Sequence, residues 1–189
     1  MRVMMRIYRN YLYVFVLLFF ISCRSKQQAF TTWEVYRGDK GSTGYSALGQ
    51  INKSNLDKIK VAWTYHTGDA RKGNRSTVEC NPIIANGMMY ITSAGLKLLS
   101  LDPASGKEIW KFDPFAGSEP TGVNRGVTYW EAGADNRIFF SAGIYLYALN
   151  ADNGSLITTF GDSGKVDLRK GLGRDYENLA VWAPSPGII

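Results

Sequence analysis

Apolar and polar positions alternate in short runs along most of the chain, and Gly, Asn or Asp separates the runs. Runs with period two are typical of half-buried strands, and no segment sustains the period of about 3.6 residues that a long helix requires. The pattern predicts two groups of four strands, at residues 82–84, 88–93, 96–101 and 108–112, and at 127–130, 137–142, 145–149 and 156–160. A short helix is predicted at 51–60 and a separate strand at 61–65. The body is therefore predicted to be all-β.

The two groups of strands are copies of one another. Residues 91–102 (ITSAGLKLLSLD) recur as residues 139–150 (FFSAGIYLYALN), with Ser-Ala-Gly at the same place in both. Repeats of about 40–50 residues with strand-type composition are typical of β-propellers, whose blades bury their faces against neighbouring blades. Residues 185–189 (SPGII) resemble residues 81–84 (NPII) at the start of the first copy. We therefore predict a partial propeller of about two blades and the start of a third, too few to close a ring.

The amino-terminal segment is predicted to direct export. Residues 1–10 are cationic and residues 11–21 form an uninterrupted apolar run. At about 1.5 Å per residue, a helix of that length is much shorter than a hydrocarbon core of roughly 30 Å, which favours a secretion signal over a permanent span. A small residue before Cys23 resembles a bacterial lipoprotein signal and predicts cleavage before Cys23 with lipid on its sulfur. An ordinary signal peptide with a chance cysteine is the alternative.

The expected organisation is a signal at 1–23, a polar tether at 24–32 and a propeller portion at 33–189. A lipid anchor at Cys23 implies a periplasmic, outer-membrane or cell-surface protein of a bacterium, attached to the membrane through that lipid.

Charge and cysteine content exclude some functions. The formal net charge is +6, but three of the 22 Lys and Arg residues lie in the first ten positions and the others are interleaved with Asp and Glu along the chain. A nucleic-acid surface needs cations clustered on one face, so no nucleic-acid partner is expected. Cys23 and Cys80 are the only cysteines, too few for a disulfide framework or a cysteine metal site. Cys80 is interpreted as a small buried hydrophobe rather than a reactive thiol.

A tryptophan motif narrows the type of propeller. Residues 100–110 (SLDPASGKEIW) place an Asp and a Gly ahead of Trp110, and Trp63 stands at the corresponding outer-strand position before it. This layout resembles the tryptophan-docking motif of pyrroloquinoline-quinone (PQQ) dehydrogenases. An indole that bridges adjacent blades buries a large apolar area and leaves its N–H for a backbone carbonyl. The second copy departs from the motif, with Asn150 for Asp and Thr158 for Trp.

Longer segments extend the resemblance over residues 33–189. They resemble the amino-terminal part of the PQQ-dependent glucose and alcohol dehydrogenase family, with residues 125–130 (RGVTYW) most similar to the glucose dehydrogenase branch. The remaining matching segments are 45–56, 61–69, 160–168 and 185–186. The resemblance implies an eight-bladed propeller that holds PQQ and a divalent ion, usually calcium, near its axis. It also implies oxidation of a sugar or alcohol, with a quinone or cytochrome as electron acceptor.

Two cofactor contacts of that family match residues of this chain. Arg125 matches an arginine that faces a cofactor carboxylate, and a guanidinium can pair with a carboxylate through two parallel hydrogen bonds. Glu79 matches a glutamate just before the first full blade. It could accept a hydrogen bond from the cofactor or orient Arg125, and both interpretations stay open.

The resemblance also implies what this chain lacks. Alcohol-oxidising relatives carry adjacent cysteines where this chain has residues 119–124 (EPTGVN), so their vicinal disulfide is absent. The family's metal ligands, its catalytic Asp and the Trp beneath the cofactor belong to later blades. No catalytic residue and no metal ligand is therefore expected here. His66, the only histidine, is interpreted as a strand-end residue.

The leading hypothesis is the amino-terminal part of an exported PQQ-dependent sugar or alcohol dehydrogenase, inactive as this chain alone. The alternative is a non-catalytic propeller lipoprotein that acts as an assembly scaffold at the outer membrane. A scaffold shares the tryptophan repeats and the lipid anchor, but it has no need for Glu79 or for residues 125–130. A small sugar- or polymer-binding β module is a third interpretation, which the half-finished third repeat disfavours.

Overall fold

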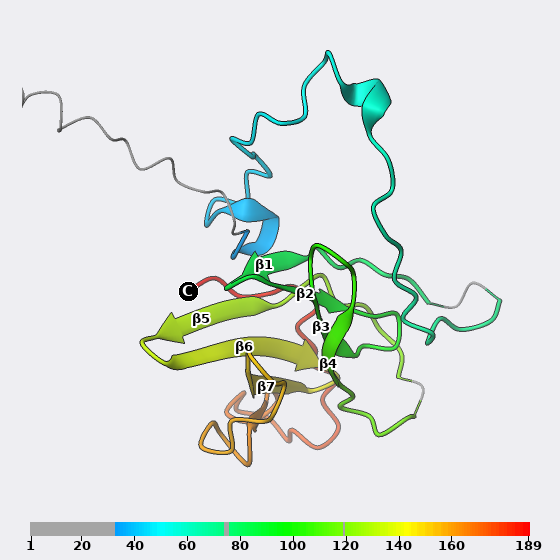
Figure 1. Ribbon diagram of the computed structural model, residues 1–189. Coiled ribbons are helices and arrows are strands. Elements are labelled where there is room, and N and C mark those ends of the chain that lie inside the picture. Colours follow the sequence, from blue (N-terminus) through cyan, green and yellow to red (C-terminus); the bar gives the residue numbers. More distant parts are fainter. Residues whose placement is uncertain (1–32, 74–75, 119) are drawn as a thin grey trace, which may run out of the picture.

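The computed structural model describes residues 33–73, 76–118 and 120–189 (Figure 1). Two four-stranded antiparallel sheets follow one another along the chain, and within each sheet every strand pairs with the next strand in sequence. The first sheet contains β1 (Ile83–Ala85), β2 (Met88–Thr92), β3 (Leu98–Leu101) and β4 (Glu108–Phe112). The second contains β5 (Thr128–Ala132), β6 (Asp135–Ala142), β7 (Tyr145–Asn150) and β8 (Lys165–Asp167). The described residues also include two 3-10 turns, η1 (Tyr36–Gly38) and η2 (Leu56–Lys58).

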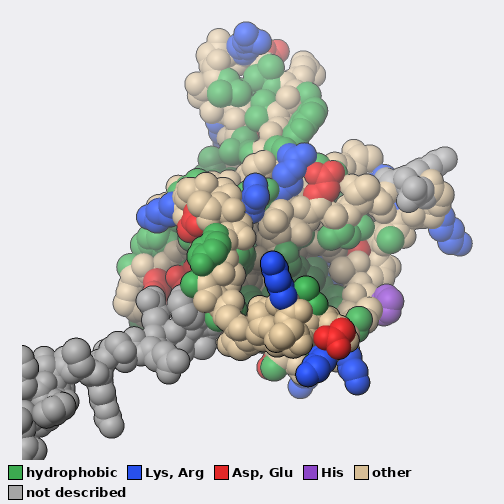
Figure 2. Space-filling model, turned by 90° about the horizontal axis from the view of Figure 1, so that it is seen from above, with side chains coloured by type: hydrophobic (Ala, Val, Ile, Leu, Met, Phe, Trp, Pro, Cys, Tyr) green, Lys and Arg blue, Asp and Glu red, His purple; other side chains and the backbone are tan. Residues whose placement is uncertain are grey.

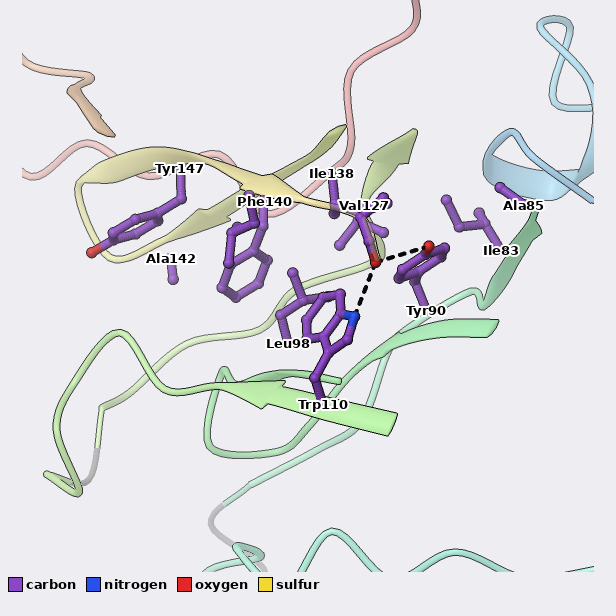
Figure 3. Close-up of a cluster of buried hydrophobic side chains, with 12 residues drawn as sticks. Ile83, Ala85, Tyr90, Leu98, Trp110, Val127, Ile138, Phe140, Ala142 and Tyr147 are labelled. Atoms are coloured by element: carbon purple, nitrogen blue, oxygen red, sulfur yellow. Dashed lines mark hydrogen bonds between the residues drawn. The ribbon is translucent and has the colours of Figure 1, made fainter. Parts of the chain in front are cut away.

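The core lies between the two sheets, as blades of a propeller require. Tyr90, Leu98 and Trp110 of the first sheet face Ile138 and Phe140 of the second (Figure 3). All four residues of β3 are buried, so this strand is covered on both faces. Neither sheet alone could bury these side chains, because each sheet supplies only one wall of the cluster.

Both tryptophan docks of the predicted motif are present. The indole N–H of Trp110 donates to the carbonyl of Ala151 at 2.9 Å, and the hydroxyl of Tyr90 donates to the same carbonyl at 3.2 Å (Figure 3). Gly154 has φ of 71°, and a Cβ there would lie 2.5 Å from the Trp110 ring, so only glycine fits. The indole N–H of Trp63 donates in the same way to the carbonyl of Pro103 at 3.1 Å.

Asn150, which stands where the motif has an aspartate, forms the same turn as Asp102. The carboxylate of Asp102 accepts hydrogen bonds from the backbone N–H groups two and three residues later, at 2.8 and 2.7 Å. The Oδ1 atom of Asn150 accepts the two equivalent bonds, at 3.0 and 3.2 Å. An amide and a carboxylate therefore build the same Asx turn.

One predicted strand of the second sheet is wrong. Leu156 makes a single bridge to Leu149, and the residues after it form a turn in which the N–H of Phe160 donates to the carbonyl of Ile157 at 2.8 Å. Gly161, with φ of 56°, and Gly164, with φ of 96°, then reverse the chain, and the outermost strand is β8 instead. The glycine pair turns the backbone before a strand at 156–160 can extend.

The predictions for residues 51–65 are also wrong in part. The helix expected at 51–60 is only η2, and its apolar side chains Ile51, Leu56 and Ile59 stay exposed. A short helix without a packing partner is marginal in water. Residues 61–65 pair with no strand of the described chain. Residues 45–62 run as an arm away from the two sheets (Figure 1).

Candidate functional site

The residues just before β1, β5 and the final segment lie side by side. The N–H of Asn81 donates to the carbonyl of Arg125 at 2.9 Å, and the N–H of Arg125 donates to the carbonyl of Pro184 at 2.7 Å. We call Asn81, Arg125 and Pro184 the rim residues. Each opens one repeat, so successive repeats converge at this rim. Gly126 permits the approach, because a Cβ there would lie 3.1 Å from the carbonyl oxygen of Asn81.

Glu79 and Arg125 form an ion pair at the rim. Nη2 of Arg125 lies 3.1 Å from Oε2 of Glu79, with side chains 41% and 38% exposed. An ion pair this exposed contributes at most about 1 kcal/mol to stability. The contact uses one of the five N–H donors of the guanidinium, which leaves capacity for a further acceptor. The structure therefore brings the two sequence-predicted binding residues together in a solvent-facing position.

Asn124 is a residue that the sequence reasoning missed. It is 3% exposed, and its Nδ2 donates to the carbonyl of Ser141 at 2.9 Å. Its Oδ1 accepts the N–H of Gly126 at 2.8 Å, and its backbone carbonyl accepts the hydroxyl of Thr92 at 3.3 Å. The Asn-Arg-Gly sequence at 124–126 was the available signal, because an asparagine two residues before a glycine is typical of an Asx turn.

A pocket of about 430 Å³ lies beside the rim. Its walls come from residues 121–123, 141–144 and 180–184, together with Leu96, and most of these side chains are apolar. Apolar concave surfaces with a few polar groups nearby are typical of small-molecule sites. The charged pair and the pocket thus share one end of the two sheets.

Cys80 precedes the rim residue Asn81 and is partly buried. Burial raises the pKa of its thiol, although the hydrogen bond from Thr92, whose N–H lies 3.2 Å from Sγ, acts in the opposite direction. The thiol therefore remains protonated at neutral pH, and a protonated thiol is a poor nucleophile. This environment agrees with the interpretation of Cys80 as a small apolar residue.

His66 lines a second groove, of about 710 Å³, between residues 63–68 and the first sheet. Within the part of the chain that the structure describes, no three His, Cys, Asp or Glu side chains gather into a possible metal site. Over the same residues, no helix is long and apolar enough to cross a membrane. The predicted lipid-bearing Cys23 lies outside the described residues.

Positive side chains are spread over the face shown in Figure 2, with Asp and Glu among them. A nucleic-acid surface gathers Lys and Arg into one patch or stripe. The visible distribution thus gives no support to nucleic-acid binding on this face.

Comparison with known proteins agrees with this geometry. The family described as "Glucose/ethanol/alcohol dehydrogenase, beta-propeller domain" (PQQ) matches residues 33–189. The chain belongs to this PQQ dehydrogenase β-propeller family. A curated relative, quinoprotein glucose dehydrogenase A of Acinetobacter calcoaceticus, is 33% identical over an alignment of 185 positions. The match covers 83% of this chain and 23% of that protein. The glycerol dehydrogenase large subunit of Gluconobacter oxydans is 32% identical and covers 88% of this chain and 24% of its own length.

Two solved dehydrogenase structures have a similar fold over part of their length. The crystal structure of quinohemoprotein alcohol dehydrogenase from Comamonas testosteroni matches with a TM-score of 0.62 and 25% identity, over 78% of this chain and 21% of that one. A europium-containing methanol dehydrogenase matches with a TM-score of 0.53 and 26% identity, over 66% of this chain and 22% of that one. The two sheets are therefore blades of a partial β-propeller. The chain spans about a quarter of the length of these two curated relatives.

Proposed function

We propose that residues 33–189 are the amino-terminal part of a PQQ-dependent dehydrogenase that oxidises a sugar, of the glucose type, or an alcohol. The observation that carries this proposal is the ion pair of Arg125 and Glu79 at the rim where the repeats converge. The family match supports it, because both residues lie within the matched segment. The relatives described above are all named as dehydrogenases, which favours this function over the assembly-scaffold alternative.

The hydrogen-bond donors of Arg125 suit the carboxylates of PQQ. PQQ carries three carboxylates, and Arg125 presents a permanently charged, half-exposed guanidinium that can bind one of them through two hydrogen bonds. When bound, PQQ supplies the two-electron acceptor for oxidation of the substrate. Glu79 holds one edge of the guanidinium and so fixes which of its N–H groups face the cofactor.

The remaining parts of the proposed enzyme lie outside the residues of this site. A divalent ion such as calcium, its ligands and the catalytic base are assigned to later blades of a full-length protein. A quinone or a cytochrome would take the electrons onward. Export, lipid attachment at Cys23 and a periplasmic or outer-membrane location complete the proposal. On this assignment the chain binds PQQ through Arg125 but does not turn over substrate alone.

Calorimetric titration of the full chain with PQQ tests this assignment. We expect binding in the wild type and a loss of about 1.5–3 kcal/mol of binding free energy in Arg125→Ala, the usual value for a charge-assisted hydrogen bond. Arg174→Ala is the matched control, because Arg174 is also an exposed arginine and is neither a rim residue nor part of the pocket wall. Equal affinities in both variants would remove Arg125 from the site. No binding by the wild type would contradict the proposal for this chain.

A further inference from the structure

Asn124 is one of three residues that directly precede the rim residues in the chain. Asn81, Arg125 and Pro184 are linked in series by backbone hydrogen bonds, and Cys80, Asn124 and Ala183 directly precede them in the chain. The hydroxyl of Thr92 donates to the carbonyl of Asn124, and the hydroxyl of Ser141 donates to the carbonyl of Ala183. One hydroxyl from the end of β2 and one from near the end of β6 therefore bond the carbonyls of the residues that precede Arg125 and Pro184.

The amide of Asn124 adds two bonds to these backbone and hydroxyl contacts. The other two preceding residues carry a thiol at Cys80 and a methyl group at Ala183, yet the backbone series continues through both neighbouring rim residues. The rim thus forms without an amide in two of its three positions. In the middle position the buried amide joins the carbonyl of Ser141 to the N–H of Gly126. The additional bonds flank one residue only, Arg125.

Arg125 is the rim residue whose side chain needs such support. Its guanidinium is 41% exposed and its ion pair with Glu79 is weak for that reason. An arginine side chain loses about 2 kcal/mol of rotamer entropy when it is fixed, so its placement depends on a rigid backbone. A buried amide whose nitrogen and oxygen both hold hydrogen bonds gives that rigidity, because breaking these bonds leaves polar groups without partners.

We infer that Asn124 is a positioning residue: its buried amide fixes the backbone of Arg125 and so holds the guanidinium against Glu79 at the rim. The consequence for PQQ rests on the proposed function. The expected order of the Arg125 side chain is independent of the proposed function, because all of these contacts lie within the chain itself.

The test uses Asn124→Ala in the full chain with two measurements. The first is the Nε–H NMR signal of the Arg125 guanidinium, assigned by its disappearance in Arg125→Lys. We expect a distinct signal in the wild type that merges with those of exposed arginines in Asn124→Ala. The second is the dissociation constant for PQQ, which we expect to rise about tenfold, equivalent to about 1.4 kcal/mol.

A purely structural effect is separated by two further variants. Tyr90→Phe removes another buried hydrogen bond, to the carbonyl of Ala151, without touching the rim. It should lower stability and leave the Arg125 signal and the PQQ affinity unchanged. Asn124→Ser keeps a side-chain oxygen that can accept the N–H of Gly126, so we expect it to recover part of both measurements.

The outcomes decide between the two proposals. An unchanged Arg125 signal in folded Asn124→Ala overturns the positioning role. If that variant does not fold, Asn124→Ser decides: we expect only part of the wild-type order there, so a signal identical to that of the wild type overturns the role of the amide. Failure of the wild type to bind PQQ contradicts the proposed function, whereas the NMR signal still decides the role of Asn124.

Discussion

Trp110 and Trp63 make the same contact with the turn of the following repeat, but their surroundings differ. Trp110 lies in β4, is 9% exposed and packs against Tyr90 with ring centroids 5.9 Å apart. Trp63 lies in the unpaired segment 61–65 and is only partly buried, and Val61 beside it is 83% exposed. The comparison separates two things: the docking contact is a local property of an indole and a turn, whereas burial requires a sheet on each side.

A second difference is how the segment that carries each tryptophan is attached to the rest of the first sheet. The β4 strand that carries Trp110 pairs along its length with β3. The segment that carries Trp63 is instead attached to β4 by a hydrogen bond from the hydroxyl of Tyr65 to Glu108. Burial, together with this bond to Glu108, raises the pKa of Tyr65 to about 12, so the hydroxyl donates at all physiological pH values. A single side-chain hydrogen bond thus attaches the Trp63 segment, whereas backbone pairing with β3 attaches the strand of Trp110.

The largest expected difference comes from removing each indole. We expect Trp110→Ala to lower the free energy of unfolding by about 3–5 kcal/mol, as is usual for a buried large aromatic side chain. Trp63→Ala should cost only about 1–2 kcal/mol, because much of its surface stays in water. Urea unfolding followed by circular dichroism measures both. Equal losses would mean that the dock itself, rather than burial, stabilises the two repeats.

The glycines beneath the indoles give a smaller contrast. A Cβ at Gly154 or at Gly106 would lie 2.5 Å from the ring of Trp110 or Trp63 respectively, and both glycines have φ of 71°. We expect Gly154→Ala to cost about 2–4 kcal/mol from backbone strain and overpacking against a confined ring. Gly106→Ala should cost less, because Trp63 can move outward. Thermal unfolding of the pair measures the difference, and a larger loss at Gly106 would contradict a mobile Trp63.

The sequence predicted both docks because their determinants are local. Gly106 and Gly154 mark left-handed turn positions, and the spacing to the tryptophans is readable in the repeat. It failed for residues 156–160, where the strand position was taken from the first copy although Gly161 and Gly164 reverse the chain. A pattern copied from one repeat cannot show where the next repeat inserts residues.

The candidate site was only partly readable for a different reason. Arg125 and Glu79 were found through the family resemblance, and the sequence left open whether Glu79 orients Arg125. The structure shows the pair, at 3.1 Å. Asn124 was missed because its bonds to Thr92 and Ser141 form only when both sheets are folded, and the local bond to Gly126 was the one signal that the sequence offered. Such positioning residues depend on tertiary contacts that local sequence does not encode.

The smallest expected difference between the two docks is their response to acid. Asp102 and Asn150 build equivalent turns beneath Trp63 and Trp110, but only Asp102 can bind a proton. Hydrogen bonds accepted chiefly from Ser105 lower the pKa of Asp102 below its usual range. A lowered folded-state pKa contributes stability that is present above the unfolded value of about 3.9 and is lost as pH falls through the folded value. Asn150 binds no proton, so its turn is insensitive over that range.

We therefore expect the indole N–H NMR signal of Trp63 to shift and broaden as pH falls below about 4, while that of Trp110 keeps its position. Asp102→Asn, which copies the second turn into the first, should abolish the response of Trp63. A response that persists in Asp102→Asn would show that the turn beneath the indole is not its source, and would point to the segment held by the bond between Tyr65 and Glu108. The two docks would then differ in how the strand is attached rather than in the turn beneath the indole.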